Sequence, residues 1–189
     1  MKSHHKLNLR LDTQELKQAL VDNPDLFGQY NQRGSAEGSP HREMTDIWIR
    51  YKDIKPHLES GDFSTFGDEH DSVWYSSSNL LPVKRLLFQI MAEVDGERLG
   101  GVLITKLPPH GVIHPHIDGG WHAGYYDKYY VPIQSSKGDV FGFEDGDVIP
   151  SEGDVWWFNN SVVHWVKNET DNYRFSLIVC IKTENRLGE

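Results

Sequence analysis

The sequence predicts a mainly β protein whose strands form an antiparallel barrel or a two-sheet jelly roll. From residue 99 onward, short runs rich in β-branched and aromatic residues follow one another at regular spacing. Turn signals rich in Gly and Pro separate these runs, for example at residues 108–111 and 151–153. Helical periodicity does not interrupt them, which favours antiparallel pairing of neighbouring strands.

The predicted core occupies residues 99–182 of a single domain that spans residues 1–189. Its seven strands are predicted at residues 101–107, 112–118, 125–133, 139–143, 155–158, 161–167 and 173–182. Residues 1–98 are expected to form an N-terminal extension of helices, a strand and loops. We expect the helices of this extension to pack on the outside of the sheet.

The extension contains two helical patterns, one strand pattern and two polar stretches. Residues 12–24 open with a capping box and end at a proline, which predicts a short helix. Residues 82–95 begin with a proline and carry one apolar stripe, which predicts a second helix. Residues 46–51 alternate polar with apolar side chains, as a strand does. Residues 32–40 and 59–72 lack periodicity, so we expect mobile loops able to fold over a substrate.

The composition limits the partners of the protein. Its 19 basic and 28 acidic residues give a formal net charge of −9, which gives no support to nucleic-acid binding or to attachment to an anionic membrane. The single cysteine, Cys180, cannot form an intrachain disulfide, and no secretory or membrane-spanning segment is apparent. We therefore expect a cytoplasmic protein that acts on a small molecule or a peptide, with an oligomeric state that the sequence leaves open.

Three residues of the predicted core form a pattern typical of an iron site. His116 and Asp118 are two residues apart, so on a strand both side chains point to the same face. His164 lies on a later strand, between valines that share its face. Two imidazoles and one carboxylate bind Fe(II) and leave other coordination positions open for O2 and an organic cosubstrate. The sequence therefore predicts an oxygenase with His116, Asp118 and His164 as its metal ligands.

The last predicted strand carries a candidate carboxylate anchor. Arg174 and Ser176 share one face of this strand, opposite a continuous apolar face, and should point into the barrel. A buried guanidinium needs a partner, and its two parallel N–H groups match a carboxylate. We expect this partner to be a 2-oxo dicarboxylate cosubstrate, with Ser176 as a second donor. The alternative is an internal salt bridge between Arg174 and an acidic side chain such as Asp154.

These motifs resemble the Fe(II)- and 2-oxoglutarate-dependent oxygenase superfamily and, within it, the aspartyl/asparaginyl β-hydroxylase family. The similarity spans about residues 99–182 and is carried by the sequence stretches 107–118, 153–160 and 164–168, together with Arg174 and Ser176. It implies the double-stranded β-helix, a cupin-like jelly roll. It also implies that His116, Asp118 and His164 bind iron and that Arg174 binds the distal carboxylate of 2-oxoglutarate.

Two departures separate this chain from the family pattern. The family usually has Arg-x-His-x-Pro on the third strand, where this sequence has Lys128 and Tyr130 before Pro132. Lys128 and Tyr130 occupy the matching face and are the remaining candidates for cosubstrate binding. The vertebrate enzymes of the family also lack the carboxylate ligand that Asp118 supplies. Membership of the family therefore does not by itself indicate an aspartyl substrate.

Other residues are candidates for the rim of the site. His114, Trp121, His122 and Trp156 are predicted to contact the substrate. The simpler interpretation is that the two histidines are exposed or contact residues that bind the ligands, and that the two tryptophans pack in the barrel. Five other histidines lie in polar surroundings and are expected to be solvated: His4, His5, His41, His57 and His70.

We compare three hypotheses for the function. The first is an oxygenase that uses Fe(II), 2-oxoglutarate and O2, hydroxylates a C–H bond and releases succinate and CO2. The second is a cupin-type metal dioxygenase or isomerase without a 2-oxo acid, which would not need Arg174 and Ser176. The third is a noncatalytic jelly-roll module that binds a ligand. A structural zinc usually has four protein ligands. A set of three ligands therefore argues against a structural metal in such a module.

Overall fold

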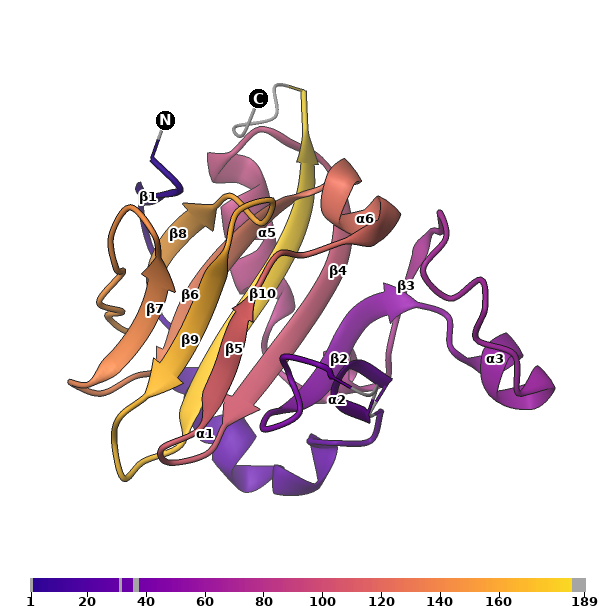
Figure 1. Ribbon diagram of the computed structural model, residues 1–189, viewed down its shortest axis with the longest axis horizontal. Helices are drawn as coiled ribbons and strands as arrows, with labels where there is room; N and C mark the ends of the chain where they lie inside the picture. Colours follow the sequence, from indigo (N-terminus) through magenta and orange to yellow (C-terminus); the bar gives the residue numbers. More distant parts are fainter. Residues whose placement is uncertain (1, 31, 36–37, 185–189) are drawn as a thin grey trace.

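Two β-sheets that face each other form the body of the protein (Figure 1). The structure is a computed structural model and describes residues 2–30, 32–35 and 38–184. Within these residues, the larger sheet has the strand order β1-β8-β6-β10-β4-β2-β3 and the smaller sheet has the order β5-β9-β7. Neighbouring strands are antiparallel throughout. The predicted jelly roll is confirmed.

The N-terminal half supplies both edges of the larger sheet. That sheet contains β1 (His4–Arg10), β2 (Thr45–Lys52), β3 (Ser72–Trp74), β4 (Gly96–Leu107), β6 (Asp127–Gln134), β8 (Asp154–Phe158) and β10 (Arg174–Thr183). The smaller sheet contains β5 (Val112–His116), β7 (Asp139–Phe143) and β9 (His164–Asn168). The α-helices are α1 (Gln14–Asp22), α2 (Gln32–Ser35), α3 (Lys55–Ser60), α4 (Ser77–Leu80), α5 (Lys84–Glu93) and α6 (Gly120–Tyr125), and a 3-10 helix spans Pro24–Leu26.

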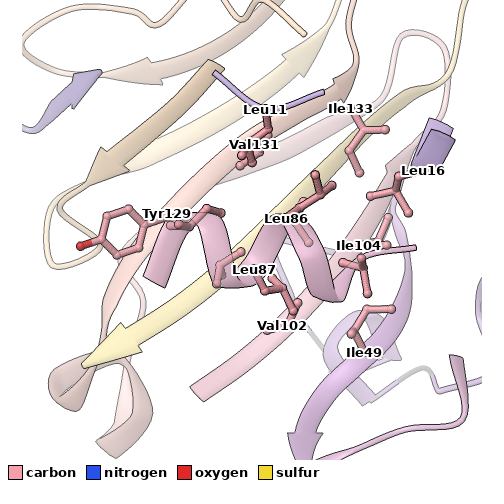
Figure 2. Close-up of a cluster of buried hydrophobic side chains, with 14 of the residues drawn as sticks. Leu11, Leu16, Ile49, Leu86, Leu87, Val102, Ile104, Tyr129, Val131 and Ile133 are labelled. Atoms are coloured by element: carbon pink, nitrogen blue, oxygen red, sulfur yellow. The ribbon is translucent and has the colours of Figure 1, made fainter. Parts of the chain in front are cut away.

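Helices α1 and α5 cover the outer face of the larger sheet, as predicted. Figure 2 shows Leu86 and Leu87 of α5 against Val102 and Ile104 of β4. Leu86 and Leu87 are 1% and 0% exposed. Each such side chain contributes about 1.5–3 kcal/mol when it is fully removed from water. This apolar layer holds the larger sheet in place, so its inner face can carry polar groups.

Strand β10 shows how the sequence separates core from cavity. Its odd-numbered residues from Phe175 to Ile181 belong to the main hydrophobic core. Arg174, Ser176 and Ile178 line a cavity between the two sheets. This alternation was predicted from the two-residue repeat of a strand. Tyr173, which was included in the apolar face, precedes the strand and is 46% exposed.

The strand predicted at residues 112–118 is shorter than expected. Strand β5 ends at His116, and Asp118 lies in the turn that follows it. Gly120 has a φ of +82°, a conformation that favours glycine, and it marks the change of chain direction. The backbone N–H of Asp118 donates to the carbonyl of Asn160 over 3.0 Å. Asp118 is thus placed by a turn and a long-range hydrogen bond instead of by the strand.

Helix α6 replaces the beginning of another predicted strand. The strand expected from residue 125 starts at Asp127, because residues 120–125 form a helical turn. Trp121 and Tyr125 stack across this turn with ring centroids 4.9 Å apart. Two glycines at its start gave no helical signal, so the turn depends on this packing. Strand β9 also begins later than predicted, at His164.

Strands β1 and β3 were not predicted. β1 has few apolar residues and is held by backbone pairing with β8. The two polar stretches of the extension also contain short helices, since α2 falls within residues 32–40 and α3 ends at Ser60. In the part of the chain that the structure describes, no helix is both long enough and apolar enough to cross a membrane.

Candidate metal and cosubstrate site

A cavity between the two sheets brings together the seven residues predicted to bind metal and cosubstrate. Its lining includes His116, Asp118 and His164 from the proposed metal site. It also includes Lys128 and Tyr130 of β6 and Arg174 and Ser176 of β10. The smaller sheet and the turn after it therefore contribute the candidate metal ligands, while the larger sheet contributes the candidate cosubstrate residues.

The three candidate metal ligands converge at the end of the smaller sheet. His116 at the end of β5 pairs with His164 at the start of β9, and the centroids of their rings lie 4.4 Å apart. The Nε2 atom of His116 is 3.7 Å from Oδ1 of Asp118. The Nε2 atom of His164 is 3.6 Å from Oδ2 of the same carboxylate. Both ring nitrogens therefore face the carboxylate of Asp118 across a short gap.

Backbone hydrogen bonds fix the orientation of both imidazoles. Nδ1 of His116 lies 2.7 Å from the carbonyl oxygen of His114. Nδ1 of His164 lies 2.9 Å from the carbonyl oxygen of Val162. A carbonyl only accepts, so we assign the ring proton to Nδ1 and the lone pair to Nε2 in each case. Imidazoles held in this way are typical metal ligands, and the donor set fits a divalent iron ion.

Lys128 lies at the metal end of the cavity. Its Nζ donates to Oδ2 of Asp118 over 2.5 Å, and the two side chains are 15% and 14% exposed. Burial alone would raise the pKa of Asp118, but Lys128 and the two nearby histidines outweigh it and hold this pKa below its usual range. The carboxylate is therefore ionised, as a metal ligand must be.

Arg174 lies at the other end, among neutral acceptors. Its Nη1 donates to the carbonyl of Val140 over 2.8 Å and to that of Lys167 over 3.3 Å. Its Nη2 donates to the Tyr130 hydroxyl over 2.7 Å, and its Nε is buried without a partner among the described residues. Arg174 is only 2% exposed. A fully buried guanidinium with a free donor has room for an anionic ligand.

The alternative of an internal salt bridge to Asp154 is wrong. Asp154 pairs with Lys6 at 2.8 Å. Over residues 2–30, 32–35 and 38–184, no carboxylate forms an ion pair with Arg174.

Lys128 and Tyr130, which were predicted to act together, have different neighbours. Tyr130 contacts Arg174, whereas Lys128 contacts Asp118. Burial raises the pKa of Tyr130, although Arg174 and Ser176 oppose the rise, so its hydroxyl stays protonated. Because Arg174 donates to the oxygen of this hydroxyl, the Tyr130 proton remains available to a ligand.

The four residues predicted to contact substrate do not line this cavity. His114 lies beside Glu43 with a separation of 3.6 Å, and its side chain is 46% exposed. Trp156 packs against the aromatic cluster around Tyr130. Trp121 and His122 belong to α6, and His122 lines a second cavity next to Asp118.

The sequence analysis missed two residues that reach the site from the N-terminal half. Arg33 of α2 and His41 line the same cavity as the candidate metal ligands. The expectation that His41 is solvated was wrong, since its ring packs edge-on against His116 with a centroid distance of 4.7 Å. Burial, together with the nearby charge of Arg33, lowers the pKa of His41 to about 2, so the ring is neutral. Neither residue belongs to a periodic pattern that marks it as functional.

His41 could also provide a metal ligand. His41, His116 and Asp118 each have one potential ligand atom, and these three atoms lie within 4.8 Å of one another. We favour His164 as the second histidine ligand, because it lies on a strand paired with β5 and a backbone carbonyl orients its ring. His41 has no such support, as its Nδ1 is buried without a hydrogen-bond partner among the described residues.

Comparisons with known proteins agree with this fold. A solved structure of a viral collagen prolyl hydroxylase from Paramecium Bursaria Chlorella virus-1 is similar over 97% of both chains, with a TM-score of 0.51 and 10% identity. A protein of the 2OG-Fe(II) oxygenase family from Burkholderia pseudomallei is similar over 76% of this chain and 68% of its own, with a TM-score of 0.51 and 14% identity. At these identities the likeness concerns the fold alone.

The sequence comparisons identify the family. No curated protein matches the chain in sequence. A family model described as aspartyl/asparaginyl beta-hydroxylase matches residues 75–183, more than half of the 189 residues. The match extends beyond the similarity noted at residues 99–182 and takes in helix α5. The chain therefore belongs to the aspartyl/asparaginyl β-hydroxylase family.

Proposed function

We propose that this protein is a non-haem Fe(II)- and 2-oxoglutarate-dependent oxygenase that hydroxylates a C–H bond. The observation that carries the proposal is the position of Arg174. It is a buried cation without a carboxylate partner among the described residues, and it lines the same cavity as His116, Asp118 and His164. When bound, Fe(II) and 2-oxoglutarate would supply the oxidising power for O2 to hydroxylate a substrate, with release of succinate and CO2.

The residues of the chain would prepare this chemistry by holding the metal, by binding the cosubstrate and by excluding water. His116, Asp118 and His164 would hold the metal through two nitrogens and one oxygen, in an orientation already fixed by the backbone. Arg174 would bind the distal carboxylate of 2-oxoglutarate, and the protonated hydroxyl of Tyr130 would donate to it.

The apolar lining of the cavity would exclude water from these groups. Phe141, Phe158, Val166 and Ile178 form this lining on the two facing sheets. Electrostatic contacts are stronger in such surroundings than in water. The apolar lining would therefore strengthen the binding of a carboxylate by Arg174 and the binding of the metal by its ligands.

The other two hypotheses explain less of the site. A cupin-type dioxygenase or isomerase that needs no 2-oxo acid gives no role to Arg174 and Tyr130. A noncatalytic ligand-binding module gives no role to a set of three ligands with open positions. Both alternatives predict that the protein does not bind 2-oxoglutarate in the presence of iron.

Anaerobic titration with Fe(II) and then 2-oxoglutarate tests the proposal. We expect the weak visible charge-transfer band of the iron chelate in the wild type and its loss in His164→Ala. His114→Ala is the matched control, because it removes a histidine of β5 that lies outside the cavity. The proposal fails if the wild type shows no band, or if the band is undiminished in His164→Ala.

Turnover needs a second measurement. Succinate release across a panel of small molecules and peptides identifies a substrate, and the product mass identifies the reaction. A gain of one oxygen atom supports hydroxylation, whereas a loss of two hydrogens would show desaturation instead.

A further inference from the structure

A second cavity adjoins the first at the candidate metal site. The two cavities share Arg33, His41, Asp118, Lys128 and Ile178. The second cavity does not include Arg174. Its remaining walls come from four elements, with Tyr51 on β2, Gly101 and Leu103 on β4, Cys180 on β10 and His122 on α6. This arrangement leaves space next to the metal ligands that a bound cosubstrate at Arg174 would not fill.

The charge lining the two cavities is opposite to the charge of the whole chain. The formal net charge of the protein is −9. The described residues that line the cavities include the cations Arg33, Lys128 and Arg174, but Asp118 is their one carboxylate. Asp118 is already held by Lys128 at 2.5 Å. Arg33 and Lys128 are ion-paired, with Asp46 and Asp118, but the side chains that line the two cavities still comprise three cations and one carboxylate, and such a lining favours an anionic ligand over a cationic one.

The imidazole of His122 is uncharged, so it does not change the balance of charged side chains that line the second cavity. The backbone N–H of Gly101 donates to Nε2 of His122 over 3.1 Å, so this ring nitrogen is unprotonated. Burial, together with the nearby charge of Lys128, lowers the pKa of His122 to about 3. The charged side chains that line the second cavity are Arg33, Lys128 and Asp118, and Asp46 pairs with Arg33 from outside this lining.

Arg33 is held in place as a recognition group would be. Its Nη1 contacts Oδ2 of Asp46 at 2.8 Å, and Asp46 is a buried residue of β2. Burial alone would lower the pKa of Arg33, but the Asp46 carboxylate outweighs it and keeps the guanidinium charged. A guanidinium has five N–H groups. Since Asp46 takes one of these in the described structure, donors remain for a second carboxylate.

Gly101 keeps the second cavity open. A Cβ at this position would come within 3.0 Å of the Tyr51 ring and 3.1 Å of the His122 ring. Any larger residue would therefore narrow the space between these two rings. The cavity thus combines a cation at one wall with the rings of Tyr51 and His122 at another.

We propose that the second cavity binds the substrate to be oxidised, and that this substrate is a small molecule whose carboxylate is bound by Arg33. The inference rests on the function proposed above, because it assigns a substrate to the same metal site. It differs from what the formal net charge of −9 alone would suggest, since three of the four charged side chains that line the two cavities are cations.

Benzoate and benzamide provide a matched pair of probes, because they have the same shape and differ in charge. NMR titration of the metal-free protein should show that the wild type binds benzoate at least tenfold more tightly than benzamide. Arg33→Gln should remove this preference. The inference is overturned if the wild type does not prefer benzoate, or if Arg33→Gln keeps the preference. It is also overturned if Arg174→Gln, and not Arg33→Gln, removes it, because benzoate would then occupy the proposed cosubstrate site.

Two further variants guard against misfolding. Arg33→Lys keeps the charge and should retain part of the preference for benzoate over benzamide. The NMR spectrum of this variant reports whether the protein still folds with a substitution at position 33. Gly101→Ala changes no charge and should weaken both probes, since its methyl group enters the space beside Tyr51 and His122. Unchanged binding in Gly101→Ala would place the probes elsewhere and would also overturn the inference.

The Fe(II) and 2-oxoglutarate titration separates this inference from the proposed function. If the wild type shows no charge-transfer band, the proposed function fails. If the band is normal but benzoate binding does not depend on Arg33, only the substrate assignment fails. Arg33→Gln should change 2-oxoglutarate affinity less than Arg174→Gln, because the carboxylate anchor of the cosubstrate stays in place.

Discussion

Arg174→Ala is expected to weaken 2-oxoglutarate binding by about 2–4 kcal/mol, the range for removing one side of a buried charged pair. At about 1.4 kcal/mol for each factor of ten, this corresponds to a Kd roughly 30 to 1000 times higher. The structure supports a value within this range, because Arg174 is 2% exposed and water cannot replace its donors easily. The anaerobic titration of the Fe(II)-loaded protein measures the change directly.

The same substitution also affects folding, and this must be separated from binding. Arg174 donates to the carbonyls of Val140 and Lys167, which would lose a partner in the variant. Each buried group left without a hydrogen bond costs about 1–3 kcal/mol of stability. Arg174→Lys keeps the charge but loses the planar fork, so it should bind more weakly than the wild type and more tightly than Arg174→Ala.

Arg50→Ala is the matched control for the loss of an arginine. Arg50 is half-buried on β2, donates to the Leu99 carbonyl over 3.1 Å and does not line the cavity. It should lose some stability and keep its 2-oxoglutarate affinity. An unchanged affinity in folded Arg174→Ala would refute the reasoning and would move the carboxylate anchor to another residue.

Three further predictions follow from other contacts. Lys128→Met should bind Mn(II) more tightly in a metal titration, because the ammonium no longer competes for Oδ2 of Asp118; equal or weaker binding would contradict this. Gly142→Ala should lower the free energy of unfolding by about 1–3 kcal/mol in urea, because its Cβ would lie 2.1 Å from the Trp165 ring; an unchanged midpoint would show that the ring moves aside. Burial raises the pKa of the Cys180 thiol to about 11, so the folded protein should resist iodoacetamide at about pH 8 and react once unfolded in urea, as mass spectrometry can show.

The strands of the core were predictable because their sequence pattern and their burial have the same physical cause. On β10, alternate side chains must face the helices or the cavity, so Arg174 and Ser176 could be placed on the cavity side from the two-residue repeat alone. The same argument placed His164 correctly. For Asp118 the argument predicted a position next to His116, but it assumed that the residue lies on the strand. Asp118 lies in a turn that is fixed by a hydrogen bond to Asn160.

Contacts between distant segments were not predictable from local patterns. Arg33 and His41 come from a polar stretch, and their burial depends on a salt bridge to Asp46 and on ring packing against His116. Neither interaction leaves a periodic trace in the sequence. The separation of Lys128 from Tyr130 was missed for a similar reason, since both share one strand face but each binds a different neighbour.

The position of these missed residues bears on how the protein would choose its substrate. The family model begins at residue 75, and the candidate metal ligands and Arg174 all fall within its match. Arg33 and His41 precede the match, yet both line the two cavities beside Asp118. On our proposals, the matched region would supply the reaction, while the segment before it would supply the cation that recognises the substrate. Members of the family that share the metal and cosubstrate residues but differ in this segment should therefore oxidise different substrates, because the charge at this wall of the second cavity would change while the metal and cosubstrate residues would not.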